Sequence, residues 1–220
     1  MRFRDRTDAG RQLATRLATA YAARNDVMVL GLPRGGVAVG VEVARELGAA
    51  FDVFVVRKLG VPGHPELAMG AIAAGRVRVV SEDLIRELAI PDAVVDQIAE
   101  RESLELERRE HLYRGNRATP VLTDRIVIVV DDGLATGSTM EAAVSALRRH
   151  RPARIVIAVP VGAPETCHRL KRLADEVVCV ESPDPFTAVG MWYERFDQLN
   201  DAEVIALLNQ AGGSSNENPM

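Results

Sequence analysis

Short runs of apolar and mostly β-branched residues recur along the chain, and stretches with helical spacing separate them. Each run is apolar at nearly every position, which is typical of strands that are buried on both faces. Because the runs alternate with helices, they predict right-handed βαβ units and a parallel sheet flanked by helices, an α/β fold. The expected strands are residues 27–30, 52–56, 125–130, 154–159 and 177–180.

The segments between these runs carry the helices. Apolar positions four residues apart predict an amphipathic helix over residues 9–23, and a second helix ends at Gly48, which we interpret as its C-cap. Residues 82–118 are predominantly helical and highly charged, so we interpret them as an insertion with a solvated face. Residues 182–200 carry several aromatic side chains outside the regular pattern, and a short helix follows from about Asn200.

Length and composition indicate a single domain. The apolar residues make up 47% of the 220 positions and the charged residues 26%, which is a globular balance. We expect one domain over residues 1–210. Residues 211–220 contain too little apolar surface to fold, and we expect them to form a mobile tail.

Charge and cysteine content exclude several classes of function. With 27 Lys and Arg against 31 Asp and Glu, the chain has no global basic field, so binding of nucleic acid by bulk electrostatics is not expected. The two cysteines form no disulfide framework and no zinc motif. No apolar run approaches the roughly 20 residues of a membrane span, and the first residues are charged where a signal peptide is apolar. We expect a soluble, cytoplasmic protein without a membrane partner.

Residues 126–140 carry the chemistry. They read as a buried strand, a tight loop and the start of a helix, and ligands of such sheets bind beyond the carboxyl ends of the strands. The small residues of the loop let backbone N–H groups converge, and the hydroxyls of Thr136, Ser138 and Thr139 add donors. With the positive end of the helix dipole behind it, this loop is predicted to bind a phosphate.

Two carboxylates, Asp131 and Asp132, lie just before that loop. They cannot bind the same anion and suit vicinal hydroxyls or a hydrated Mg²⁺. A phosphate site and a diol site this close together describe a ribose 5-phosphate. The loop lacks the lysine of a Walker motif, and the chain lacks the glycine fingerprint of dinucleotide-binding proteins.

The order of strand, acid pair, Thr-Gly-x-Thr loop and helix resembles the phosphoribosyl-pyrophosphate (PRPP) signature of the type I phosphoribosyltransferases. Residues 33–36 resemble the pyrophosphate loop of that family, whose strained backbone turns its amides toward the leaving group. Arg57 and Lys58 resemble the basic pair that opens its flexible catalytic loop, and the glycines and prolines that follow suit a closing lid. The chain to about Leu208 is similar to a group of bacterial phosphoribosyltransferase-like proteins with the motifs GLPRGG, VRKLG-P, VDDGLATG and AVPVGAPE.

The resemblance implies a Rossmann-like core with a small hood, to which residues 182–200 belong. It also implies Mg²⁺-dependent transfer of a phosphoribosyl group from PRPP to a nitrogen acceptor, with release of pyrophosphate. The implied catalytic residues are Arg57, Lys58, Asp131 and Asp132, of which the two acids also hold the metal, directly or through water or ribose hydroxyls. The implied PRPP-binding residues are Arg34, Gly35, Gly36, Asp131, Asp132, Ala135, Thr136, Gly137, Ser138 and Thr139. We expect a homodimer that binds PRPP and a small-molecule acceptor.

The acceptor stays open. Ala135 stands where the hypoxanthine-guanine enzymes carry an acid, as in the adenine and orotate enzymes, whereas residues 183–190 resemble the purine-stacking segment of the hypoxanthine-guanine enzymes. Phe186 and Trp192 are candidates for stacking on the acceptor, but we favour ordinary packing against the core for each. Two other functions stay open: a regulatory protein that senses PRPP or a nucleotide without turnover, and a hydrolytic or phosphorolytic enzyme for a ribosyl phosphate.

Overall fold

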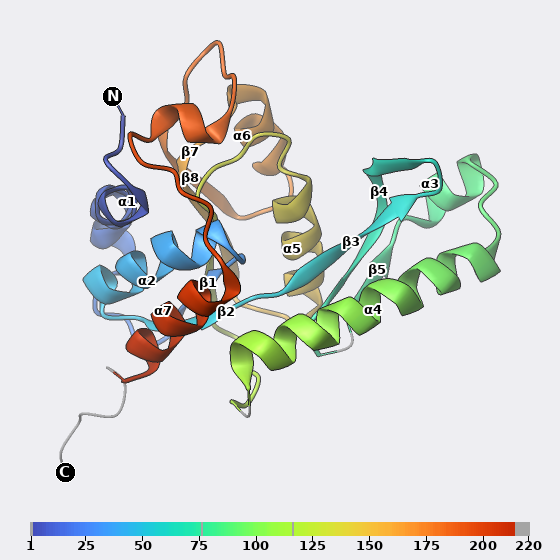
Figure 1. The fold of residues 1–220 in the computed structure, drawn as a ribbon, viewed down its shortest axis with the longest axis horizontal. Coiled ribbons are helices and arrows are strands. Elements are labelled where there is room, and N and C mark those ends of the chain that lie inside the picture. Colours follow the sequence, from blue (N-terminus) through green and yellow to red (C-terminus); the bar gives the residue numbers. More distant parts are fainter. Residues whose placement is uncertain (1, 76, 116, 214–220) are drawn as a thin grey trace.

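A five-stranded parallel sheet forms the centre of the larger part of the molecule (Figure 1). The computed structural model describes residues 2–75, 77–115 and 117–213. The strand order is β2-β1-β6-β7-β8, and each neighbouring pair is parallel, which confirms the expected α/β fold class. The strands are β1 (Val27–Gly31), β2 (Ala50–Val53), β6 (Ile126–Val130), β7 (Arg154–Val161) and β8 (Glu176–Glu181).

The helices that cover the two faces of this sheet are α1 (Arg6–Tyr21), α2 (Gly35–Leu47), α5 (Ser138–Arg149) and α6 (Pro164–Leu170). Successive side chains of a strand point to opposite faces, so the apolar strands supply a core on each side. α1 and α2 pack with Val29 and Ile128 on one face. α5 and α6 pack with Val127 and Ile157 on the other. Gly48 ends α2 with a φ of 64°, as expected for a C-cap glycine.

A smaller antiparallel sheet and a long helix project from one side of the larger sheet (Figure 1). Its strands lie in the order β3-β4-β5, and two helices follow them. These elements are β3 (Val56–Val61), β4 (His64–Ala73), β5 (Val77–Val80), α3 (Glu82–Glu87) and α4 (Asp92–Arg114). Both helices lie in the charged segment 82–118. Among the residues that the structure describes, no helix is long and apolar enough to span a membrane.

The predicted second strand and the loop after it are wrong in detail. The apolar run over residues 52–56 divides between two sheets, because β2 ends at Val53 and β3 begins at Val56. The basic pair therefore lies inside β3 and not at the end of a strand. The residues after it form a β-hairpin instead of a loop, since β3 pairs with β4 around a turn at Pro62 and Gly63. Gly63 has a φ of 77°, which suits such a tight turn.

The C-terminal segment ends in a helix that packs against α2, β2 and α4. It contains a 3₁₀ turn, η1 (Val189–Trp192), and the helix α7 (Asp201–Gly213). Val204 and Leu208 of α7 are buried in a cluster with residues of α2, α4 and the small sheet. α7 extends to Gly213, so residues 211–213 of the expected tail are helical. Residues 214–220 lie outside the described residues.

A buried ion pair attaches α4 to the larger sheet. Nη2 of Arg114 lies 3.1 Å from Oδ2 of Asp52 and donates to the carbonyl oxygen of Val53 at 3.2 Å. The two charged side chains are only 7% and 11% exposed. Burial raises the pKa of Asp52, and the arginine acts against that shift. Since breaking one partner of such a pair leaves a buried charge, this contact fixes the projecting part relative to the sheet.

Candidate active site

The acid pair lies at the carboxyl edge of the parallel sheet, where two loops meet. β6 ends at Val130, directly before Asp131, and its neighbour β1 leads into residues 33–36 and the start of α2. A Cβ atom on Gly35 would lie 1.9 Å from Oδ2 of Asp132, and one on Gly36 would lie 2.4 Å from the carbonyl oxygen of Val130. Only glycine therefore allows the two loops to approach this closely. The Pro33–Arg34 peptide bond is cis.

Burial dominates the electrostatics of the pair. It raises the pKa of Asp131 well above the ordinary value, and the neighbouring charge of Asp132 raises it further. Burial also raises the pKa of Asp132, but the guanidinium of Arg6 acts in the opposite direction. Oδ1 of Asp131 accepts the backbone N–H of Asp132 at 2.9 Å. The two carboxylates are therefore unequal. Asp132 has an ion-pair partner in Arg6, which is distant in the sequence, whereas desolvation dominates at Asp131.

Arg6 is a site residue that the sequence analysis missed. Its Nε donates to Oδ2 of Asp132 at 2.8 Å, and its Nη1 donates to the carbonyl oxygen of Asp197 at 2.8 Å. The guanidinium carbon also lies 4.0 Å from the ring centroid of Phe196. In the sequence, Arg6 is one of several arginines in a charged N-terminal run, so no periodicity or motif distinguished it.

The loop over residues 135–139, which we call the phosphate loop after its predicted ligand, leads from the acid pair into α5. Ala135 and Thr136 are exposed, whereas Gly137 is buried with a φ of 72°, in the left-handed region that favours glycine. α6 supports the loop from behind. The hydroxyl of Thr166 donates to the carbonyl oxygen of Ala135 at 2.6 Å, and Nη2 of Arg169 donates to that of Thr136 at 2.5 Å.

Lys58 reaches this loop from the smaller sheet, and Arg57 does not. Nζ of Lys58 donates to the hydroxyl of Ser138 at 3.2 Å. Arg57 instead donates to Oε2 of Glu102 on α4, from Nε at 2.9 Å and from Nη2 at 2.6 Å. Neighbouring residues of a strand point to opposite faces, so only one of the pair can face the loop. The structure therefore places Lys58 at the phosphate loop and Arg57 on the opposite side of β3, against α4.

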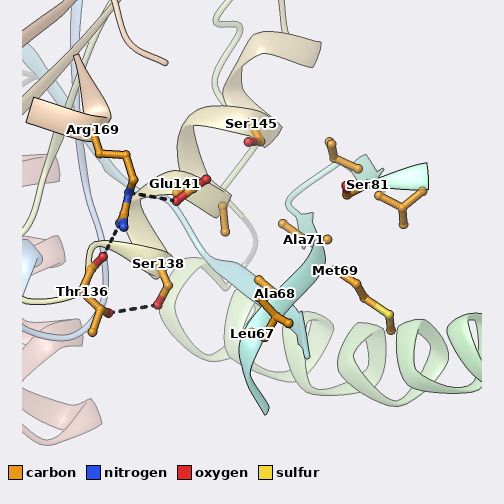
Figure 2. A pocket seen from close by; sticks show the side chains of 14 residues that line it. Leu67, Ala68, Met69, Ala71, Ser81, Thr136, Ser138, Glu141, Ser145 and Arg169 are labelled. Atoms are coloured by element: carbon orange, nitrogen blue, oxygen red, sulfur yellow. Dashed lines mark hydrogen bonds and ion pairs between the residues drawn. The ribbon is translucent and has the colours of Figure 1, made fainter. Parts of the chain in front are cut away.

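A pocket of about 410 Å³ opens beside the phosphate loop (Figure 2). Figure 2 shows Arg169 in contact with Thr136 and Glu141 on one wall, and the hydroxyl of Ser138 beside that of Thr136. The opposite wall is the β4–β5 hairpin, mostly apolar. The loop hydroxyls thus border open space that is large enough for a small ligand.

The aromatic residues expected near the acceptor lie in residues 182–200, which we call the hood segment. Phe186 and Trp192 are half-buried and pack with Phe3 and Tyr193, so packing accounts for both. Contact with an acceptor stays a prediction. The hood segment does reach the acid pair, because the hydroxyl of Tyr193 donates to the carbonyl oxygen of Asp132 at 2.7 Å.

Two predicted site residues, Arg34 and Thr139, do not line this pocket. Arg34 is half-buried at the start of α2, and its positive charge acts on Tyr113 of α4. Thr139 is exposed in the first turn of α5. In the described part of the chain, no group of three or more His, Cys, Asp or Glu side chains could hold a metal ion. Two carboxylates suit a Mg²⁺ ion that keeps several waters and is also bound by the oxygens of a phosphorylated ligand.

The acid pair and the phosphate loop lie at the carboxyl edge of a parallel sheet, next to the loop that contains Gly35 and Gly36. This arrangement is typical of a phosphoribosyltransferase-like site. The phosphoribosyl transferase domain model matches residues 4–194, and the chain belongs to this family. The chain is 48% identical over 209 residues to a predicted phosphoribosyl transferase of Mycobacterium tuberculosis, across 95% of this chain and 47% of that protein. It thus spans about half the length of the curated relatives it matches.

Two further proteins are similar to this chain. The crystal structure of TT1426 from Thermus thermophilus is 44% identical in sequence and superposes with a TM-score of 0.88, covering 96% of this chain and 99% of that one. The bifunctional protein PyrR of Staphylococcus saprophyticus is 28% identical over 134 residues, which are 60% of this chain and 74% of PyrR.

The conformation of Gly137 generates a first prediction. A Cβ atom there would lie 2.5 Å from Cγ2 of Thr166, in addition to the left-handed φ. We expect Gly137→Ala to lower the free energy of unfolding by more than the roughly 1–2 kcal/mol of left-handed strain alone. Gly63→Ala is the matched control, because Gly63 has a φ of 77° and nothing within 4 Å of the added Cβ. Urea unfolding measures both; equal losses would show that the contact with Thr166 is relieved at little cost.

The unequal acids generate a second prediction. Because burial raises the pKa of Asp131, its ionised form is costly in the folded protein at neutral pH but not in the unfolded chain. Asp131→Asn should therefore increase the free energy of unfolding, by about 1.4 kcal/mol per unit of that pKa shift. The gain should vanish at about pH 4 and below, where the wild-type carboxyl is protonated in both states.

Asp132→Asn is the control for this prediction, because it removes the partner of Arg6 and should give a smaller gain or a loss. The measurement is urea unfolding of the three proteins across this pH range. A gain for Asp131→Asn that does not depend on pH would contradict the role of ionisation.

Proposed function

We propose that the protein transfers a phosphoribosyl group from PRPP to a nitrogen acceptor and releases pyrophosphate. The observation that carries this proposal is that two separate segments converge: Lys58 of β3 reaches the loop that leads from the acid pair after β6 into α5, and its Nζ lies 3.2 Å from the hydroxyl of Ser138. A 5-phosphate and a ribose need this combination of a cationic donor, hydroxyl donors and carboxylate acceptors.

The phosphate loop would anchor the 5-phosphate. Its N–H groups and the hydroxyls of Ser138 and Thr139 are donors at the start of α5, where the helix dipole favours an anion. Lys58 adds a positive charge at the same place. Anchoring this end of the substrate positions the ribose over the acid pair and orients C1 toward the acceptor.

The acid pair would hold the ribose. Asp131 and Asp132 are acceptors for vicinal hydroxyls or for waters on Mg²⁺, which supplies positive charge to the pyrophosphate when it is bound. In the reaction the bond from C1 to the pyrophosphate oxygen breaks, its electron pair leaves with pyrophosphate, and the acceptor nitrogen forms the new bond. Positive charge develops on the ribose meanwhile, and buried carboxylates stabilise it. In this arrangement the loop of residues 33–36, which includes Arg34, would face the leaving pyrophosphate.

The acceptor is proposed to be a nucleobase beneath the hood segment. The hood segment lies beside the acid pair, because Val189 packs so closely on Gly133 that a Cβ atom added to Gly133 would lie 2.5 Å from Cγ1 of Val189. Phe186 and Trp192 are the aromatic residues of the same segment.

A second function, sensing of PRPP or a nucleotide without turnover, is favoured by one observation. Two of the charged groups assigned to catalysis are held in ion pairs within the protein. Asp132 is paired with Arg6, and Arg57 is paired with Glu102 on α4. A site in which charges are neutralised internally can bind a ligand and yet stabilise the transition state poorly.

Pyrophosphate release in a screen of purine and pyrimidine bases separates these functions. The full chain is incubated with Mg²⁺ and PRPP, with each base in turn and without any base, and calorimetry measures binding of PRPP. Release that depends on one base supports the transferase. Binding without release supports the sensor, and release without a base indicates hydrolysis of PRPP. Absence of PRPP binding would contradict the proposed function.

The two faces of β3 generate a prediction for this site. Lys58→Ala removes a cationic donor at the phosphate loop, so the affinity for Mg²⁺-PRPP should fall by about tenfold or more. Arg57→Ala is the matched control, since Arg57 faces Glu102, and it should cause a much smaller loss of affinity. Calorimetric titration of both variants measures the difference. Equal losses would show that the hairpin acts as a unit and that Lys58 has no special place in it.

A further inference from the structure

Arg6 connects three segments that are far apart in the sequence. It begins α1, its guanidinium binds the carboxylate of Asp132, and it also contacts Phe196 and Asp197 after the hood turn. From this geometry we propose that Arg6 is a positioning residue of the phosphoribosyl site, which acts on the ligand through Asp132. The proposal rests on the proposed function, because the ligand held by Asp132 is PRPP.

Arg6 occupies one oxygen of the carboxylate. Oδ2 of Asp132 accepts from Nε of Arg6 at 2.8 Å, and the same oxygen faces Gly35. Oδ1 lies farther from this glycine, 3.0 Å from the position of a Cβ atom on Gly35, compared with 1.9 Å for Oδ2. A carboxylate has about four acceptor positions, so an ion pair at one oxygen fixes the plane of the group and leaves capacity at the other for a hydroxyl.

Arg6 is itself rigidly held. Its side chain is 13% exposed, Nη1 donates to the carbonyl oxygen of Asp197 at 2.8 Å, and the guanidinium lies 4.0 Å from the ring centroid of Phe196. The planar guanidinium can hold a carboxylate, a carbonyl and an aromatic face at once, which an ammonium group cannot do. The ion pair between Arg6 and Asp132 is therefore partly buried and held in one geometry, unlike an exposed surface ion pair.

Asp132 is also held from the hood by its backbone. The hydroxyl of Tyr193 donates to the carbonyl oxygen of Asp132 at 2.7 Å, and Tyr193 packs against Phe196 with ring centroids 4.9 Å apart. Tyr193 thus holds the backbone of Asp132, and Phe196, which packs on Tyr193, contacts the arginine that holds its side chain. The positions of α1 and the hood segment consequently determine where the carboxylate stands relative to the phosphate loop.

Arg4 provides a matched control. It lies two residues before Arg6, but its side chain is 67% exposed and it pairs with Asp8 at 3.4 Å within the same N-terminal segment. Exposed ion pairs of this kind contribute little free energy. A general effect of removing positive charge near the N-terminus should therefore be the same for both arginines, whereas an effect through Asp132 should be confined to Arg6.

The test is a double-mutant cycle on the full chain, with Mg²⁺-PRPP titrated by calorimetry. Arg6→Ala should weaken binding by about tenfold or more, and Arg4→Ala should leave it within about twofold. Asp132→Asn alone should also weaken binding, and adding Arg6→Ala to it should cause little further loss, because the carboxylate through which Arg6 acts is already gone. Arg6→Lys should restore part of the affinity.

Several results would overturn the proposal. Losses that add in the double variant would show that Arg6 acts independently of Asp132, and equal effects of Arg6→Ala and Arg4→Ala would show a general charge effect. Thermal unfolding of each variant checks the fold, and Arg6→Gln, which keeps the side-chain stem and one donor, replaces Arg6→Ala if that variant does not fold. If the wild type does not bind PRPP, the proposed function falls as well; if it binds and Arg6→Ala binds equally, only this proposal falls.

Discussion

Close contact between two loops at the carboxyl edge of the sheet governs the whole site. β1 and β6 are hydrogen-bonded neighbours in parallel register, so the loops that follow them leave the sheet side by side. The gap between them has no room for a Cβ atom at Gly35 or Gly36. This contact contributes to the burial that raises the pKa of Asp131 and of Asp132. Arg6 and Tyr193 add contacts to Asp132 from α1 and from the hood segment.

Burial of the acid pair lowers the stability of the folded protein. Two neighbouring carboxylates are desolvated, although a protein core usually excludes unpaired charge. Within the described residues, Asp132 has a cationic partner at hydrogen-bond distance, and Asp131 has none. Proteins commonly retain such local costs where a function requires them. The buried pair of Asp52 and Arg114 shows the contrasting case, in which each charge has its partner and the contact joins two parts of the fold.

The elements that could be predicted from the sequence are those marked by hydrophobic periodicity or by a motif. β1, β6 and β7 are continuous apolar runs because both of their faces are buried, and the acid pair and phosphate loop carry a specific motif. β4 was missed because small residues such as Gly70 and Ala71 replace the usual β-branched side chains. Arg57 and Lys58 were grouped together because their separation to opposite faces follows only once the segment is known to be a strand. Arg6 was missed because an ion pair across 126 positions leaves no local pattern.

The support that α6 gives the phosphate loop has a consequence for the orientation of its peptide planes. In a trans peptide unit the C=O and the following N–H point in opposite directions. Thr166 holds the carbonyl of Ala135 and Arg169 holds that of Thr136, both on the side of α6. The N–H groups of Thr136 and Gly137, which belong to those two units, therefore face away from α6. Two backbone donors are set in direction before any anion arrives, and a phosphate that binds there meets dipoles that need not reorient.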